Sequence, residues 1–348
     1  MNTDEKYMQR CLELAAKGFG KTASNPLVGC VIVHENKIIG EGFHEKFGEA
    51  HAEVNAIRSV KNKTLLKHAT LYVNLEPCSH FGKTPPCADL ILKYKIPYVI
   101  IGNTDPNKLV KGKGIQKLIT NGCDVKVGIL ENECRDLNKR FFVFHEQKRP
   151  YIILKWAQTS DGFIDKKRTL NDGQKPLQIS DENSLKLSHQ WRSEEQSILV
   201  GTNTALLDNP KLSARIVKGK NPLRILIDKD LRVPKNYFLR DDSTPTLVFT
   251  SIKKKETKNI EFIKIDFKKN SLNQVLKDLN KKNILSVIVE GGAQLLNSFI
   301  KENLWDEARI IVSPKKIKNG IAAPIFPEKI IFPTKTKTDL ILYYTNKK

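Results

Sequence analysis

The chain of 348 residues is long for a single hydrophobic core, so two domains are the better expectation. Its 59 basic and 38 acidic residues give a formal net charge of +21, and 40% of its residues are hydrophobic. No N-terminal apolar run resembles a signal peptide and no run is long enough to cross a bilayer, so we expect neither export nor membrane insertion. The six cysteines are then expected to be reduced thiols in a cytoplasmic protein.

The positive charge is compatible with a nucleic-acid partner. The lysines, however, are dispersed along the chain, and no aromatic residues alternate with them as a platform on which bases would stack. We therefore favour a compositional bias combined with anionic small substrates, and expect no nucleic-acid partner.

The first half of the chain alternates between expected helices and strands. Apolar residues at helical spacing predict an amphipathic helix over residues 5–18. The expected strands are 30–33, 38–42, 70–75, 98–102 and 125–128. The other expected helices are about 51–60, 87–92, 112–121 and 132–145. Strands and helices that alternate in this way predict an α/β layer sandwich.

Three of these elements carry residues that suit a metal ion. His51-Ala52-Glu53 opens a helix, Cys78 follows a strand, and Cys87 begins the next helix, where a thiol is more readily ionised. One imidazole and two thiols leave the fourth position of a tetrahedral zinc ion open to water, as in catalytic zinc sites. Glu53 is predicted to be catalytic, because it can take a proton from that water and pass it to departing ammonia.

A His-x-Glu followed by Pro-Cys and a second Cys is the signature of zinc-dependent nucleobase deaminases. Either piece alone is weak, but the combination of His51, Cys78 and Cys87 with Glu53 favours a catalytic zinc site. Eight residues separate the two cysteines, where two are common.

The polar, proline-ended segment Gln147–Pro150 indicates a boundary between domains at 1–146 and 150–348. Beyond it, continuous apolar runs are typical of buried parallel strands. The expected strands are 151–157, 197–201, 223–228, 246–249, 286–290 and 308–312, with helices near 180–191, 272–282 and 293–302.

Glu290-Gly291-Gly292-Ala293 closes one of these strands and opens a helix, where glycines let a phosphate approach free N–H groups. No Gly-x-Gly-x-x-Gly pattern occurs, so a Rossmann domain is not supported.

Several motifs of the first half resemble the deaminase half of the bifunctional deaminase–reductase family of riboflavin biosynthesis. They are Asn25-Pro26-x-Val28-Gly29, Gly42-x-His44, His51-Ala52-Glu53 and the run from Glu76 to Cys87, which ends in Gly82-x-Thr84-Pro85-Pro86-Cys87. In that family the loop between the cysteines has this length. The resemblance implies a cytidine-deaminase-like three-layer α/β/α domain. It also implies that Asn25, His44, His80 and Lys83 line the pocket for a diaminopyrimidinone ribosyl phosphate.

The second half is similar to the reductase half of the same family, which has a dihydrofolate-reductase-like α/β fold and uses NADPH. The motifs are Lys155-x-Ala157-x-x-x-Asp161-Gly162, Trp191-Arg192-Ser193, Gly201-x-x-Thr204, Asp208-Asn209-Pro210-x-Leu212-x-x-Arg215 and Glu290-Gly291-Gly292. The resemblance implies NADPH contacts from Thr204, Asp208, Gly291, Gly292, Ala293, Gln294 and Leu295. It implies substrate contacts from Arg192, Leu212, Arg215 and Glu290.

Two of these residue roles have a physical rationale of their own. Arg192 and Arg215 suit bidentate binding of a phosphate. For Asp208, capping of the turn before Asn209-Pro210 is as reasonable as a role near proton delivery.

The expectation is an enzyme with Zn²⁺ and NADPH as cofactors that catalyses two consecutive steps. It would deaminate 2,5-diamino-6-(5-phosphoribosylamino)pyrimidin-4-one hydrolytically, and then reduce the ribosyl group to give 5-amino-6-(5-phosphoribitylamino)uracil. The resemblance also implies a homo-oligomer, a dimer or a tetramer. Two alternatives remain open at this point, a polynucleotide (tRNA) base deaminase with an accessory domain and a non-catalytic zinc scaffold.

Overall fold

The computed structural model describes residues 2–79, 85–170, 173–326 and 332–346. The chain forms two compact units, Met1–Lys148 and Arg149–Lys348, so the division falls in the polar segment where the sequence indicates a boundary. No helix in the described ranges is long and apolar enough to cross a membrane.

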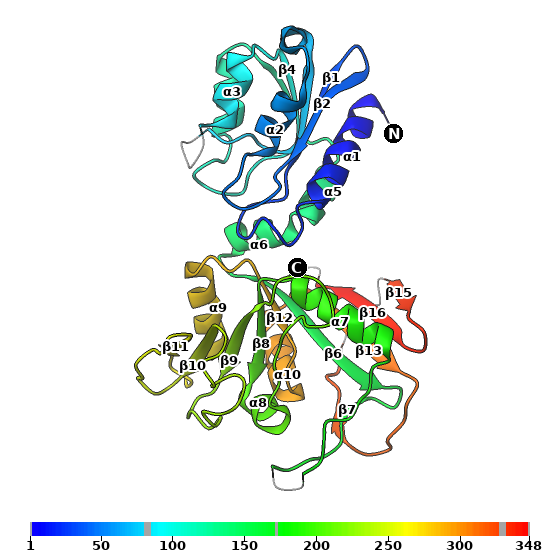
Figure 1. Ribbon diagram of the computed structural model, residues 1–348, viewed down its shortest axis with the longest axis vertical. Coiled ribbons are helices and arrows are strands. Elements are labelled where there is room, and N and C mark those ends of the chain that lie inside the picture. Colours follow the sequence, from blue (N-terminus) through cyan, green and yellow to red (C-terminus); the bar gives the residue numbers. More distant parts are fainter. Residues whose placement is uncertain (1, 80–84, 171–172, 327–331, 347–348) are drawn as a thin grey trace. The chain divides into compact units, whose positions relative to one another are not determined.

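The first unit is built on a mixed sheet with strand order β2-β1-β3-β4-β5, of which Figure 1 labels β1, β2 and β4. β1 pairs antiparallel with β2 and with β3, whereas β3, β4 and β5 run parallel. The bounds are β1 Gly29–His34, β2 Lys37–Phe43, β3 Thr70–Leu75, β4 Tyr98–Asn103 and β5 Asp124–Val127.

Helices cover both faces of this sheet because its buried strands are apolar on both sides. Cys30 and Ile32 of β1 belong to one hydrophobic cluster, whereas Val31 and Val33 belong to the other. This two-residue alternation gives each face its own core. One face is covered by α2 Ala52–Ser59, α3 Cys87–Lys93 and α4 Lys113–Thr120, and the other by α1 Thr3–Ala16 and α5 Glu131–Leu137. The expected α/β/α layering is confirmed.

The single helix expected over 132–145 is wrong, because the chain breaks it at Asn138. α5 ends at Leu137 and α6 Lys139–Gln147 follows. Asn138 is buried, and its side-chain amide accepts from the Leu27 N–H at 2.8 Å and donates to the Leu27 carbonyl at 2.9 Å. These bonds hold the segment that leads from Asn25 into β1.

The second unit is built on a sheet whose described strands have the order β11-β10-β9-β8-β12-β6-β13-β16-β15. All strands from β11 to β13 in this order are parallel to their neighbours, as the apolar runs predict, and β16 and β15 are antiparallel. The bounds are β6 Tyr151–Thr159, β8 Ser197–Gly201, β9 Leu223–Ile227, β10 Thr246–Thr250, β11 Ile260–Lys264, β12 Ser286–Val289, β13 Glu307–Ser313, β15 Phe332–Lys335 and β16 Leu340–Thr345.

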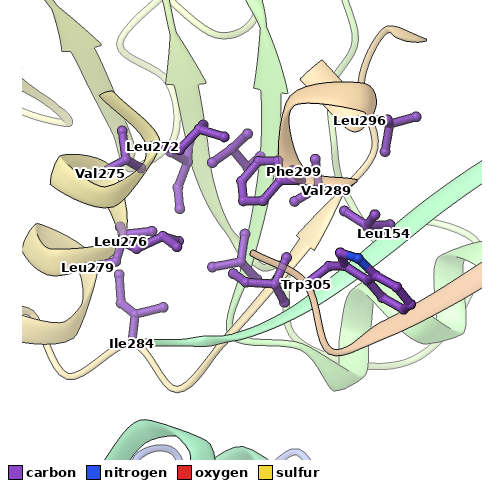
Figure 2. Close-up of a cluster of buried hydrophobic side chains, with 14 of the residues drawn as sticks. Leu154, Leu272, Val275, Leu276, Leu279, Ile284, Val289, Leu296, Phe299 and Trp305 are labelled. Carbon is purple, nitrogen blue, oxygen red and sulfur yellow. The ribbon is translucent and has the colours of Figure 1, made fainter. Parts of the chain in front are cut away.

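The core of the second unit lies between this sheet and two helices, α9 Ser271–Lys281 and α10 Ala293–Lys301. Figure 2 shows Phe299 of α10 beside Val289 of β12, with the apolar face of α9 opposite. On the other face, Trp191 of α7 Glu182–Glu194 packs edge-on against Tyr343 of β16, with ring centroids 6.2 Å apart.

The order of the parallel strands indicates which edge of the sheet is suited to bind a ligand. From β8 the chain moves outward through β9 and β10 to β11, and then returns to place β12 between β8 and β6. Open parallel sheets bind ligands beyond the carboxyl ends of their strands, where such a reversal leaves a crevice. The short helix α8 Thr202–Asp208 and the helix α10 both begin at this edge, directly after β8 and β12.

Replacing Asn138 tests its role in the first unit. Asn138→Ala leaves the buried N–H of Leu27 without its amide acceptor and takes one of the two amide donors from the carbonyl, so it should destabilise this unit by about 1–3 kcal/mol. Urea unfolding followed by circular dichroism measures the loss. Asn121→Ala is the matched control, because the Asn121 side chain bonds only a Lys117 carbonyl on the surface. Equal stabilities of the two variants would contradict this account.

Candidate active sites

The ends of three elements in the first unit bring an imidazole and two thiols together. His51 is the N-cap of α2, Cys78 lies three residues beyond the end of β3, and Cys87 is the first residue of α3. The Nδ1 atom of His51 lies 3.3 Å from the Cys87 sulfur and 3.5 Å from the Cys78 sulfur. The three ligand atoms all lie within 4.8 Å of one another.

This donor set fits a zinc ion. A tetrahedral zinc ion with ordinary Zn–N and Zn–S bond lengths separates a nitrogen from a sulfur ligand by about 3.5 Å. The Cys78 thiol accepts hydrogen bonds from the thiol and from the N–H of Cys87, which hold its pKa well below the usual range. The site therefore favours a thiolate, which is the form that binds metal.

Glu53 stands beside these ligands without being one of the clustered donors. It lies in the first turn of α2 and is 3% exposed. Burial, and secondarily the charge of Cys78, raise the pKa of its carboxyl to about 7. A buried carboxyl next to a ligand cluster is placed to exchange protons with a molecule bound there.

Asn25 and His44 form a polar wall next to His51. The Asn25 side-chain nitrogen lies 3.1 Å from Nε2 of His44, whose Nδ1 lies 3.1 Å from the Ala50 carbonyl oxygen. A neutral ring with its proton on Nδ1 satisfies both contacts, and burial accordingly lowers the His44 pKa. The His44 and His51 rings meet edge-on with centroids 5.7 Å apart. His80 and Lys83 lie outside the described residues.

Glu76 shapes this site, although its sequence pattern predicted no role for it. It is buried at the carboxyl end of β3, two residues before Cys78. Its carboxylate accepts from the N–H groups of Asp105, Gly112 and Gly114 at 2.9–3.1 Å, and from Ile115 at 3.3 Å. These bonds join the Cys78 loop to the start of α4. The position of this glutamate directly after an apolar strand could have indicated its structural role.

In the second unit, a largely buried glutamate is held by two cations. Arg192 of α7 donates to Glu290 from Nε at 2.8 Å and from Nη2 at 2.6 Å, and the Lys155 ammonium of β6 lies 3.6 Å from the same carboxylate. Burial would raise the Glu290 pKa, but the charges of Arg192 and Lys155 outweigh it and bring the pKa to about 2. Glu290 is therefore ionised.

This ion-pair arrangement changes the interpretation of two residues. Arg192 presents its bidentate edge to Glu290, so that edge is not directed at a substrate phosphate as the sequence interpretation suggested. No role was predicted for Lys155. Its position as a lysine within the apolar run 151–157 could have indicated that it pairs with a buried carboxylate.

Arg215 differs from Arg192 because it is exposed and has no carboxylate within 4.0 Å among the described residues. Leu212, three residues earlier, is 4% exposed and has a φ of 53°. Both residues follow α8 in the chain. Because no carboxylate in the described ranges pairs with it, the Arg215 guanidinium is available to an anionic group.

The joint between β12 and α10 fits a dinucleotide phosphate. A Cβ atom on Gly291 would lie 2.9 Å from the Val200 side chain of β8, and Gly292 has a φ of 50° with Thr204 Oγ1 close by. Among the described residues, no side chain caps the N-terminus of α10, so the N–H groups at Ala293, Gln294 and Leu295 face the joint without a side-chain acceptor. The structure thus gathers six of the seven residues expected to contact NADPH.

Asp208 is the seventh, and the structure gives it a partner of its own. Arg168 donates to the carboxylates of both Asp208 and Asp165. Asp208 ends α8, and Asn209 follows with a φ of 39° as the C-cap.

Comparisons with known proteins match both units. Residues 150–337 match the family described as "RibD C-terminal domain", and residues 1–103 match the "Cytidine and deoxycytidylate deaminase zinc-binding region". The riboflavin biosynthesis protein RibD of Aquifex aeolicus is 43% identical over 327 residues, which are 92% of this chain and 89% of that protein.

Two solved structures are similar over nearly the whole chain. A diaminohydroxyphosphoribosylaminopyrimidine deaminase/5-amino-6-(5-phosphoribosylamino)uracil reductase from Thermotoga maritima has a TM-score of 0.86 and 34% identity, covering 98% of each chain. Acinetobacter baumannii RibD has a TM-score of 0.88 and 30% identity, covering 99% of each chain.

Removing one thiol from the ligand cluster tests the metal site. Cys87→Ser should reduce zinc from one ion per chain to a small fraction, because a serine hydroxyl is a poor ligand at neutral pH. Zinc content after dialysis, measured by mass spectrometry, reads out the loss. Cys123→Ser is the control, since the Cys123 thiol bonds the Ile96 carbonyl and is outside the cluster. Full zinc occupancy in Cys87→Ser would contradict the assignment.

Proposed function

The chain belongs to the RibD family of bifunctional riboflavin biosynthesis enzymes, and from this premise we propose which of its residues carry out each reaction. It is a zinc-dependent deaminase and an NADPH-dependent reductase on one chain. The expected cytidine-deaminase-like first domain and the RibD reductase domain are confirmed. A tRNA deaminase is not favoured, because the relatives that match over most of the chain are riboflavin biosynthesis proteins.

The proposed substrate is 2,5-diamino-6-(5-phosphoribosylamino)pyrimidin-4-one. The first unit would replace one ring amino group by oxygen, and the second would reduce the ribosyl group to ribityl. The observation that carries the deaminase assignment is the convergence of His51, Cys78 and Cys87 beside the buried Glu53. The names of the Thermotoga maritima and Aquifex aeolicus relatives support the same two-step chemistry.

In the deaminase unit, we propose that His51, Cys78 and Cys87 hold zinc. A zinc ion held by these three residues would supply a hydroxide nucleophile by lowering the pKa of a bound water. Glu53 would accept the proton of that water on its carboxylate and return it to the departing ammonia. The position of Glu53 in the first turn of α2, two residues after the ligand His51, supports this role.

Asn25 and His44 are proposed to recognise the pyrimidine ring. Their mutual hydrogen bond and the bond from His44 to Ala50 hold both side chains in place before substrate arrives. A preorganised amide and a neutral imidazole can read the donors and acceptors of a ring edge. His80 and Lys83, on the loop between the cysteines, remain proposed contacts from the family resemblance.

In the reductase unit, we propose that Glu290, Leu212 and Arg215 contact the substrate. Arg192 would act by keeping Glu290 ionised and oriented, since its bidentate edge is already bound to that carboxylate. Lys155 shares this task from β6. Arg215 is the better phosphate ligand of the two arginines because no carboxylate among the described residues neutralises it.

NADPH supplies the hydride for this reduction. We propose that Thr204 and the segment Gly291–Leu295 bind its phosphates, because two glycines open the strand–helix joint and the first turn of α10 presents free N–H groups. Asp208 remains a proposed contact of NADPH. It also forms an ion pair with Arg168, which connects α8 to the segment that follows β7 Phe163–Asp165.

We also propose a cellular location, the absence of a nucleic-acid partner and an oligomeric state. The enzyme would be cytoplasmic, which the six free thiols support. It would bind no nucleic acid, which the dispersed lysines support. It would form a dimer or tetramer, a proposal that rests on family resemblance and that light scattering on the purified protein tests directly.

Glu53→Gln tests the proposed deaminase mechanism. An amide cannot accept the proton, so ammonia release from the diaminopyrimidinone substrate should fall by roughly 10²–10⁴-fold. NADPH oxidation with substrate that is already deaminated should remain, because this second reaction belongs to the other unit. Glu49→Gln, an exposed residue before α2, is the matched control. Full ammonia release by Glu53→Gln would rule out this role, and wild-type protein without either activity would refute the proposed function.

Arg215→Gln tests the phosphate contact in the reductase unit. Loss of one charge-assisted contact should raise KM for the deaminated substrate by about tenfold, with the dissociation constant of NADPH unchanged. Lys218→Gln removes the same charge from an exposed position three residues away. The assignment fails if both variants have the same KM, or if NADPH binding weakens in parallel with substrate binding.

A further inference from the structure

A buried histidine of the second unit has no part in the residue roles proposed above. His189 lies in α7, one helical turn before Arg192, and is 1% exposed. Both of its ring nitrogens are buried, and neither has a hydrogen-bond partner among the described residues. The buried His44 of the first unit, by comparison, has a partner at each ring nitrogen. Since buried polar side chains are almost always hydrogen-bonded, His189 has a bonding capacity that the folded chain does not use.

The ring of His189 lies among the charged groups of the proposed reductase site. Burial and the charges of Arg192 and Arg215 lower the His189 pKa to about 4, with a smaller effect of Lys155 and an opposing one of Glu290. The imidazole is therefore neutral at pH 7, and a neutral imidazole has one N–H donor and one acceptor nitrogen. Three cations and one carboxylate act on it, so its surroundings favour an anion.

The segment between α8 and β9 lies against the part of α7 that follows His189. The Ser213 carbonyl accepts from Arg192 Nη1 at 3.2 Å, and a Cβ atom on Gly219 would lie 2.6 Å from the Cβ atom of Ser193. Arg215 lies between these two contacts in the chain, and its side chain is exposed. The two contacts therefore hold Arg215 beside the last turns of α7.

A phosphate bound by Arg215 would need a further donor. A phosphate group has three strong acceptor oxygens, and the edge of one guanidinium engages two of them. Arg192 and Lys155 are both directed at Glu290, so neither is free to supply the next hydrogen bond. Among the groups that act on one another here, the N–H of His189 is the donor that is not engaged.

We propose that His189 binds the substrate phosphate together with Arg215, through a ring N–H that gains its acceptor when the phosphate arrives. The ring is nearly inaccessible in this structure, so its cover must shift for the contact to form. The segment after α8 can make such a shift, because most of its residues from Lys211 to Lys220 are exposed. This inference rests on the phosphate contact proposed for Arg215 and adds a second ligand of the same anion.

Two substitutions separate this role from simple packing. His189→Leu removes the donor and keeps the site filled, so KM for the deaminated substrate should rise about tenfold, with the dissociation constant of NADPH unchanged. Its urea midpoint should not fall, because an unpaired buried polar group is lost. His189→Gln keeps an N–H donor and should stay within about threefold of the wild-type KM. Gln190→Leu, an exposed neighbour on α7, is the matched control and should leave KM unchanged.

Nuclear magnetic resonance of the wild-type protein gives a second readout that needs no turnover. In protein labelled with ¹⁵N-histidine, the ring signals of His189 are identified by their absence in His189→Gln. These signals should shift when ribose 5-phosphate is added and stay in place when ribose is added, because only the former carries the anion.

Three results would decide against these proposals. An unchanged KM in His189→Leu, or ring signals that do not respond to ribose 5-phosphate, would overturn the inference and leave the reductase assignment intact. A KM raised equally in His189→Leu and His189→Gln would also overturn it, because altered packing would then explain the effect. A wild-type protein that does not oxidise NADPH with the deaminated substrate would overturn the proposed function, and this inference with it.

Discussion

Burying a carboxylate at the end of an apolar strand is costly unless charged or N–H groups compensate it, and both units are built around that requirement. Glu76 at the end of β3 is compensated by four backbone N–H groups, which bind the Cys78 loop to the start of α4. Glu290 at the end of β12 is compensated by Arg192 and Lys155, which bind α7 and β6 to the same point. Each carboxylate therefore fixes the site beside it.

Glu53 differs from Glu290 in the balance of these effects. It is as buried as Glu76, and burial together with the charge of Cys78 outweighs the charge of His51, which raises the Glu53 pKa to about 7. At Glu290, by contrast, the charges of Arg192 and Lys155 outweigh burial and lower the pKa. A buried carboxyl whose pKa is raised toward neutrality can exchange protons there, which is compatible with the catalytic role proposed for Glu53.

The sequence was most informative where chemistry depends on residue type and local spacing. His51, Cys78 and Cys87 were predicted as one cluster because their residue types suit zinc and their pattern with Glu53 is a known signature, and the structure brings the three ligand atoms together. The helix break at Asn138 was missed because its cause, a pair of hydrogen bonds to Leu27, joins residues 111 positions apart. Arg192 was assigned to phosphate because its guanidinium suits that role, and nothing local reveals that Glu290, 98 positions away, occupies it.

The sequence by itself indicated the fold class, the division into two units and the cluster of His51, Cys78 and Cys87. It could do so because apolar periodicity and metal-ligand residue types are local properties of the chain. Only the tertiary structure decided which charged groups are already paired and which are free for a ligand. Arg192 and Arg215 are equivalent in sequence, and they differ through a carboxylate that the fold brings near one and not the other. Electrostatic compensation depends on distance in space, which residue spacing does not encode.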